Sequence, residues 1–304
     1  MNYQWYPGHM TKAKRMMQEN IKLIDLVIEL VDARIPLSSR NPDIDELSKN
    51  KFRILLLNKA DLADARHNKA WAEYFKRQGF HVAEINSKNG TGMKSIQGVV
   101  QEACKEKIER DRRRGIVNRP VRAMVVGIPN VGKSTFINSF AGKACTKTGN
   151  KPGVTKGKQW IRLNKGLELL DTPGILWPKF EDQTVGMRLA MIGSMNDEIL
   201  PMEELALELI GFLQENYRGL LEERYGEKTE QPPEELTDSG VRKEKTAAEE
   251  WQEDAPGMLN RIGKNRHCYA KGEVLNLERA AGIVIDDFRS GKLGRITLES
   301  PCES

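Results

Sequence analysis

One short segment constrains the fold more than any other part of this sequence. Residues 127–134 read GIPNVGKS and match the pattern G-x-x-x-x-G-K-[ST] of a phosphate-binding loop. An apolar run at 122–127 predicts a strand before the loop, and residues 132–141 predict a helix after it. Glycines let backbone amides turn toward a phosphate, and the positive end of the helix points at the same charge. The chain is therefore expected to bind a nucleotide.

Two side chains of this loop have predicted chemical roles. Lys133 would reach the β- and γ-phosphates and act in catalysis, and the Ser134 hydroxyl would be a ligand of Mg²⁺. The loop residues that we expect to contact the nucleotide are Asn130, Val131, Gly132, Lys133, Ser134 and Thr135.

Alternating strand and helix patterns surround the loop. Helical patterns separate the apolar runs of the first 180 residues, which predicts an α/β domain with a mostly parallel sheet covered on both faces. The predicted strands are 25–32, 52–57, 81–85, 122–127 and 167–170, and the predicted helices are 64–78, 92–110 and 132–141. Ligands of such sheets bind at the carboxyl ends of the strands, so functional residues should follow them.

The base specificity is predicted by the sequence NKAD at 58–61, directly after the strand at 52–57. A carboxylate at Asp61 can accept hydrogen bonds from N1–H and the 2-amino group of guanine, whereas adenine would leave it unpaired. The alkyl stem of Lys59 can lie on the base plane, and Asn58 belongs to the same motif. The motif therefore favours GTP and argues against an ATP-dependent kinase.

Three further elements complete the predicted site. Asp171, in the DTPG motif at 171–174, would hold Mg²⁺ through its water shell, and the Gly174 amide would reach the γ-phosphate in catalysis. Thr155 can close over Mg²⁺ and the γ-phosphate, so we predict a catalytic and a metal-binding role for it. The backbone of Asn86, Ser87 and Lys88 could contact the guanine O6.

The order of these motifs along the chain is unusual. In ordinary translation-factor-type GTPases the phosphate loop comes first and the guanine motif last, but here the motifs at 58–61 and 86–88 precede the loop at 127–134. Since permutation changes only the connectivity, the same site can form. We therefore predict a circularly permuted P-loop GTPase domain.

The sequence resembles the ribosome-biogenesis GTPase A (YlqF-type) family. The resemblance rests on WYPGHM at 5–10, VDARIP at 31–36, PGVT at 152–155, DTPGIL at 171–176, and the phosphate-loop and guanine motifs. It spans residues 1 to about 200, with a general likeness beyond. It implies GTP hydrolysis by an assembly factor that acts late in large ribosomal subunit biogenesis, is stimulated by the subunit, and binds its rRNA and proteins.

The resemblance and one substitution also bear on hydrolysis. Ile175 occupies the position where ordinary GTPases carry a water-orienting glutamine, and its side chain cannot hydrogen-bond water. His9 is a candidate to orient that water, although a single histidine is often a surface or packing residue. Asn130 matches the asparagine that holds K⁺ in potassium-activated relatives, but asparagine also stabilises turns.

A second domain is predicted after residue 180. Helical patterns dominate 181–304, which we interpret as a smaller, mostly α-helical domain that binds RNA or the ribosome by family resemblance. Its segment 222–254 carries twelve acidic and five basic residues and predicts either an exposed acidic hairpin or a partly disordered loop. In the first domain, segment 143–165 carries seven basic residues and no acidic one, which favours either rRNA contacts or steering of the anionic nucleotide.

Composition excludes several classes of protein. Apolar runs are too short to span a membrane, the N-terminus has no secretory or Arg-rich leader, and four scattered cysteines suggest no metal knuckle. We expect a cytoplasmic bacterial monomer that uses Mg²⁺ and K⁺. The alternative function is an RNA-binding assembly factor in which GTP is mainly a structural ligand, and a GTPase of tRNA modification or signalling is a third interpretation.

Overall fold

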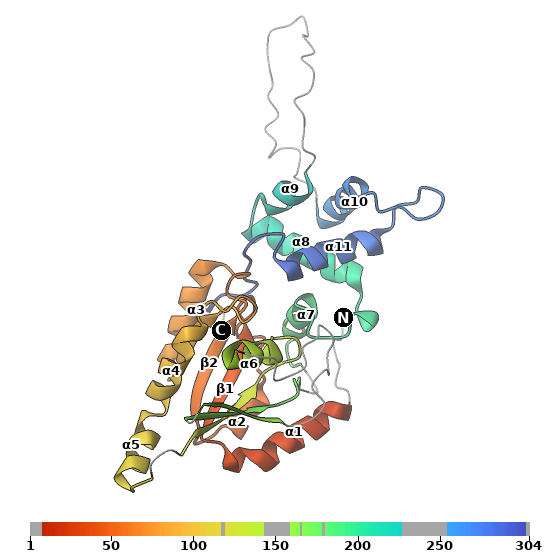
Figure 1. The fold of residues 1–304 in the computed structure, drawn as a ribbon. Coiled ribbons are helices and arrows are strands. Elements are labelled where there is room, and N and C mark those ends of the chain that lie inside the picture. The colour runs from red at the N-terminus through yellow and green to blue at the C-terminus, as the bar shows by residue number, and fades with distance from the viewer. Residues whose placement is uncertain are drawn as a thin grey trace, which may run out of the picture. The chain divides into compact units, whose positions relative to one another are not determined.

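The first structural unit is built on a six-stranded sheet. The computed structural model describes residues 8–116, 119–142, 159–164, 166–177, 180–226 and 254–301. Within them, the strand order is β3-β2-β1-β4-β6-β5, and neighbouring strands are parallel except for β5 against β6 (Figure 1). The strands are β1 (Leu26–Asp32), β2 (Phe52–Asn58), β3 (His81–Ile85), β4 (Val121–Val126), β5 (Gln159–Asn164) and β6 (Leu167–Asp171). The predicted α/β fold with a mostly parallel sheet is confirmed.

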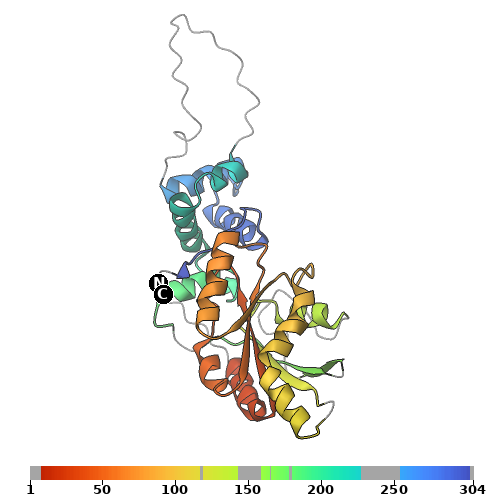
Figure 2. The ribbon, with the colours of Figure 1, turned by 90° about the vertical axis from the view of Figure 1, so that its left-hand side faces the viewer.

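Helices cover both faces of this sheet. Val31, Leu55 and Leu57 share one face and pack against Trp71 and Phe75 of α3 (Ala65–Arg77). Figure 2 shows α3 and the N-terminal helices on one side of the sheet, and α4 and α6 on the other. The other helices of this unit are α1 (Gly8–Asn20), α2 (Pro42–Leu47), α4 (Ile96–Ala103), α5 (Lys105–Arg113), α6 (Lys133–Ala141) and α7 (Gln183–Met191). Because helices cover both faces, β1 is buried along its whole length, including its two carboxylates, Glu29 and Asp32.

Two local predictions differ from the structure. The pattern at 92–110 predicts one helix, but the chain forms a 3₁₀ turn at Met93–Ser95, then α4 and α5, with a turn at the buried Cys104 between the two helices. Strand β5 had no counterpart among the predicted strands; it is a short strand at the edge of the sheet.

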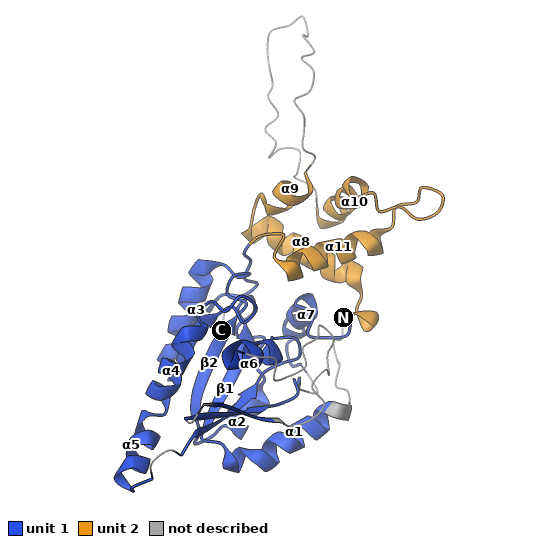
Figure 3. Ribbon diagram, in the orientation of Figure 1, with its two compact units in different colours: residues 1–196, 295–304 blue, residues 197–294 orange. Residues whose placement is uncertain are grey.

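The second unit contains helices only, within the residues described. It comprises Asp197–Gly294 and holds α8 (Met202–Asn216), α9 (Leu220–Tyr225), α10 (Ala255–Asn265), α11 (Leu277–Ser290) and a 3₁₀ turn at Asp197–Ile199 (Figure 3). Leu209, Ile262 and Ile285 contribute buried apolar side chains to its core. Asp287 of α11 accepts hydrogen bonds from Arg224 and Tyr225, which ties α9 to α11. No described helix of either unit is long and apolar enough to cross a membrane.

The end of the chain belongs to the first unit. Sequence patterns put a domain boundary after residue 180, whereas the compact units divide after Asn196, and Arg295–Ser304 returns to the first unit. The amides of Ile296 and Leu298 donate to the carbonyls of Leu62 and Arg34, at 3.0 and 2.8 Å. The second unit is thus inserted between α7 and this returning segment.

Glu299 holds the returning segment in place. Its side chain is 5 % exposed and accepts hydrogen bonds from the amides of Leu37 and Ser38, from the Ser38 hydroxyl and from Arg188. The Trp71 indole donates to the Glu299 carbonyl at 3.1 Å. Burial raises the pKa of Glu299, and the hydrogen bonds from Ser38 and the charge of Arg188 oppose this rise.

We predict that Glu299→Ala lowers the free energy of unfolding of the first unit by about 2–4 kcal/mol, because the Ser38 amide and the Arg188 guanidinium would lose a buried partner. Urea denaturation followed by tryptophan fluorescence measures the change. Glu102→Ala removes an exposed α4 carboxylate and should cost less than about 0.5 kcal/mol. Equal stability of the two variants would contradict the assignment.

Candidate nucleotide-binding site

The phosphate loop connects β4 to α6, as the sequence predicts. Gly127 and Gly132 have positive φ angles of 151° and 103°. A Cβ atom on Gly127 would lie 2.6 Å from the Leu30 carbonyl oxygen, and one on Gly132 would lie 2.5 Å from Nδ2 of Asn58. Both positions therefore require glycine for conformation and for space.

Lys133 begins α6 and is folded back onto the loop. Its Nζ donates to the carbonyls of Gly127 and Ile128, at 3.0 and 2.7 Å. The side chain is 7 % exposed, and burial lowers the pKa of Lys133 to about 8 against the opposing charge of Asp171. The ammonium group thus lies inside the loop. If a phosphate entered, the ammonium group would exchange two neutral carbonyl partners for an anionic one.

Asp171 ends β6, beside the loop. Its Oδ1 is buried without a hydrogen-bond partner among the described residues. Burial raises the pKa of Asp171 to about 6, although the charge of Lys133 and a backbone hydrogen bond from Thr172 lower it. An unpaired, buried carboxylate oxygen next to a phosphate loop fits the outer shell of a hydrated Mg²⁺.

Asn58 connects the guanine motif to the other motifs. Its Nδ2 donates to the Val131 carbonyl at 2.7 Å. Its Oδ1 accepts from the Ser87 amide at 3.1 Å and from the Ser87 hydroxyl at 2.9 Å. The structure thus brings together the guanine motif after β2, the 86–88 element after β3 and the phosphate loop after β4.

Lys59 and Asp61 differ in their surroundings. Lys59 has a positive φ of 59°, and its Nζ lies 2.8 Å from Oδ2 of Asp32, which also pairs with the buried Arg34. Burial alone favours protonated Asp32, but the charges of Arg34 and Lys59 outweigh it and lower the pKa of Asp32. Asp61 is exposed, and no hydrogen bond or ion pair among the described residues involves its carboxylate. The Asp61 carboxylate is therefore available to hydrogen-bond a guanine base.

The turn after β3 is shaped by Asn86. Its Oδ1 accepts hydrogen bonds from the amides of Lys88 and Asn89, at 2.8 and 3.1 Å. Asn86 and Ser87 are buried, whereas Lys88 is exposed. The buried Asn86 fixes the backbone around Ser87, which is the part of the element that was predicted to face the base.

Asn130 contacts the segment that follows α7. It has a positive φ of 57°, and its Nδ2 donates to the Gly193 carbonyl at 2.7 Å. The Ser194 hydroxyl donates to the Pro129 carbonyl at 2.9 Å. These bonds join the phosphate loop to the chain that leads toward the second unit, and they agree with a turn-stabilising role for Asn130.

The DTPG segment passes directly over the phosphate loop. A Cβ atom on Gly174 would lie 2.7 Å from the Pro129 nitrogen and 2.8 Å from Nζ of Lys133. Ile175, which replaces the glutamine of ordinary GTPases, is 1 % exposed and packed in the core. Its carbonyl accepts from Nδ2 of Asn41 at 3.3 Å. At the phosphate end of the site, this segment therefore contributes its backbone. Residue 175 contributes no polar side chain there.

The structure does not describe the side chains of two predicted catalytic residues, Thr155 and His9. Thr155 lies outside the described residues. His9 lies in the first turn of α1, and only its backbone is described. The next residue, Met10, is fully buried, and its sulfur accepts a hydrogen bond from the Leu176 amide at 3.4 Å. The first turn of α1 thus contacts the DTPGIL segment. Ser134 and Thr135 are half-buried at the start of α6.

Two supporting contacts were missed by reasoning from the sequence. Asp32 and Arg34 position Lys59, and Asn41 holds the carbonyl of Ile175. For Asp32 and Arg34 the available signals were the VDARIP motif at 31–36 and the charged residues at the end of the strand predicted at 25–32.

Comparisons with known proteins agree with this geometry. The family model described as "50S ribosome-binding GTPase" matches residues 122–231. Ribosome biogenesis GTPase A of Bacillus cereus is 46 % identical over 303 residues, covering 100 % of this chain and 95 % of that protein. The Thermotoga maritima protein of the same name is 32 % identical over 297 residues, covering 98 % and 94 %. The crystal structure of GNP-bound YlqF from T. maritima superimposes with a TM-score of 0.61 at 27 % identity, covering 95 % of this chain and 98 % of that one.

We predict that Asp61→Asn weakens GDP binding about a hundredfold or more and improves the binding of xanthosine diphosphate. An amide donor at this position opposes guanine N1–H and the 2-amino group but complements the 2-oxo group of xanthine. Titration calorimetry with both nucleotides measures the switch. Asp286→Asn, at an exposed position of α11, is the matched control. Unchanged GDP affinity in Asp61→Asn would remove Asp61 from the site.

Proposed function

This chain belongs to the ribosome biogenesis GTPase A family, and we propose that it hydrolyses GTP to time its departure from a late precursor of the large ribosomal subunit. It is a GTPase and an assembly factor of that subunit. The observation that carries the proposal is the Asn58 side chain, which bonds to Val131 and Ser87 and so unites three permuted motifs. This arrangement supports one site with a base end and a phosphate end.

The chain's own residues supply binding and charge neutralisation. When GTP enters, Lys133 exchanges the carbonyls of Gly127 and Ile128 for phosphate oxygens. P-loop GTPases work with Mg²⁺, and Ser134, Thr155 and the unpaired oxygen of Asp171 would hold it. The ion would neutralise charge that develops on the phosphates. Gly174 lies against the loop, and we propose that its amide donates to the γ-phosphate.

His9 is the residue that we propose to orient the attacking water. The buried Ile175 cannot do so, and the neighbouring Met10 contacts Leu176 in the same segment. This contact supports the proposal because it brings the helix turn that carries His9 next to the DTPGIL segment. An imidazole accepts a proton near neutral pH, which suits a general base.

Potassium is a second proposed contribution. A monovalent cation beside the bond between the β- and γ-phosphates would stabilise the negative charge that develops there, as an arginine finger does. Asn130 is the proposed ligand, through its side-chain oxygen, while its nitrogen bonds to Gly193.

The partner proposal concerns the large-subunit precursor, its rRNA and its proteins. Residues 181–304 and the basic segment 143–165 are the proposed contact regions, and we propose a monomer that acts in the bacterial cytoplasm. The alternative, an RNA-binding assembly factor with GTP as a structural ligand, is favoured by Ile175 alone. Lys133, Ser134 and Asp171 favour the enzyme.

We predict that purified large ribosomal subunits raise GTP turnover in K⁺ buffer about tenfold or more. His9→Ala should retain GTP affinity and lose this stimulation, because water orientation is needed only for the chemical step. His81→Ala, at the start of β3 and away from the site, is the matched control. Tight GTP binding without any stimulation of the wild-type protein would favour the alternative function.

A second prediction concerns the cation. At equal ionic strength, turnover in K⁺ should exceed turnover in Na⁺ about tenfold or more, and Asn130→Ala should remove the difference. Phosphate release measured in the two salts tests this. Equal wild-type rates in K⁺ and Na⁺ would leave Asn130 with a structural role only.

A further inference from the structure

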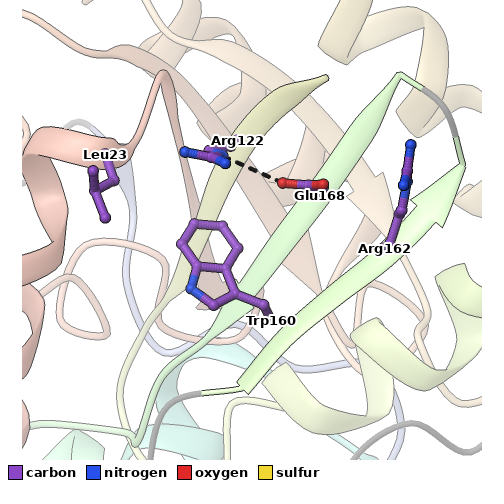
Figure 4. Close-up of a pocket in the computed structure, with 5 residues that line it drawn as sticks. All are labelled: Leu23, Arg122, Trp160, Arg162 and Glu168. Carbon is purple, nitrogen blue, oxygen red and sulfur yellow. Dashed lines mark hydrogen bonds and ion pairs between the residues drawn. The ribbon is translucent and has the colours of Figure 1, made fainter. Parts of the chain in front are cut away.

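We propose that a groove beside Trp160, at the edge of the sheet, binds one unpaired nucleotide of RNA, with its base stacked on Trp160 and its phosphate paired with Arg162. That the RNA is ribosomal rests on the proposed function. The groove has a volume of about 270 Å³ and is lined by Leu23, Arg122, Trp160, Arg162 and Glu168 (Figure 4).

The register of the strands places the polar side chains of this groove on one face of the sheet. Arg162 of β5 pairs with Glu168 of β6, which pairs with Arg122 of β4. Trp160 lies two residues from Arg162 along β5 and so shares this face. Within the described sheet, β5 is the edge strand, and the groove therefore opens at the border of the sheet.

Trp160 offers an apolar surface in a fixed position. The neighbouring Leu170 and Met124 on the same face are fully buried, whereas Trp160 is 38 % exposed. The Arg122 guanidinium lies 5.6 Å from the Trp160 ring centroid, and its Nε lies 3.2 Å from Glu168. Glu168 thus holds Arg122 over the indole. An exposed, positioned indole is a stacking platform for a base.

Arg162 supplies the charge for a phosphate. It is exposed, and no hydrogen bond or ion pair involves its guanidinium among the residues that the structure describes. Figure 4 shows its guanidinium apart from the ion pair of Arg122 and Glu168. Glu168 is therefore occupied, and Arg162 remains as a cation for an anionic ligand. In the sequence, Arg162 belongs to a segment, 143–165, with seven basic residues and no acidic one, which favours a polyanion.

The dimensions and place of the groove favour a single nucleotide. Its volume lies just below the range of about 300–1,000 Å³ for pockets that enclose drug-sized ligands, so it suits one base. Arg122 and Glu168 lie at the starts of β4 and β6, whereas the phosphate loop and the DTPG segment follow the ends of these strands. RNA bound here would leave the GTP site accessible.

The experiment measures binding of the full chain to a fluorescein-labelled, twelve-residue oligoadenylate by fluorescence anisotropy at several salt concentrations. Trp160→Ala should weaken binding about tenfold, and Trp160→Phe should retain most of the affinity because a ring remains. Arg162→Ala should lower the slope of log affinity against log salt concentration by about one. Arg77→Ala, at the exposed end of α3, is the matched control and should behave as wild type.

Basal GTP turnover and GDP affinity of each variant serve as the test of folding, since neither Trp160 nor Arg162 belongs to the nucleotide site. The proposal is overturned if Trp160→Ala and Arg162→Ala bind the oligoadenylate as tightly as the wild-type protein does. The proposal is also overturned if these variants lose the stimulation of GTP turnover by subunits but bind the oligoadenylate as the wild type does. That result indicates that the groove contacts a protein. Failure of subunits to stimulate the wild-type protein refutes the proposed function and leaves the RNA result to stand by itself.

Discussion

The site depends on one side-chain amide, that of Asn58. Its nitrogen satisfies the Val131 carbonyl and its oxygen satisfies both the amide and the hydroxyl of Ser87. Asn58 and its two partner residues are far apart in the chain, but they lie at or after the ends of strands β2, β3 and β4 of one sheet. Because all of these groups are buried, replacing the amide would leave two backbone groups without partners, each at a cost of about 1–3 kcal/mol. One residue thus fixes the distance between the base end and the phosphate end.

Buried charges surround this amide on both sides. At the base end, Asp32 is held ionised by Arg34 and Lys59. At the phosphate end, the described bonds of the Lys133 ammonium go to two neutral carbonyls, and Oδ1 of Asp171 has no hydrogen-bond partner among the described residues. Burial lowers the pKa of Lys133 to about 8 and raises that of Asp171 to about 6. The ion pairs around Lys59 are therefore complete without a ligand, whereas the phosphate end gains stabilisation from an anion and a cation. This asymmetry suits a site that keeps its base contacts while the number of phosphates changes.

Much of the fold and of the site could be predicted because local patterns determine them. The phosphate loop, the guanine motif and the parallel strands each have signals within a few residues, and the structure brings Asn58, Ser87, Lys133 and Gly174 together as expected. Contacts over long sequence separations leave no such signal. The Glu299 carboxylate on the Ser38 amide and the Met10 sulfur on Leu176 are examples. Strand β5 was missed because its pairing with β6, and not its composition, makes it a strand.

The return of residues 295–301 to the first unit has a consequence for synthesis of the protein. Trp71 and its partner Glu299 are 228 residues apart in sequence. At about 5–20 residues per second, the indole is made roughly 10–45 s before the carbonyl that accepts its hydrogen bond. During that interval the nascent GTPase unit exposes the surface that the returning segment will cover, and the inserted helices are completed first. Residues 295–301 therefore close the first unit only after the inserted helices have been made, and a chain that stops before them lacks the contacts that they make with the nucleotide-binding unit.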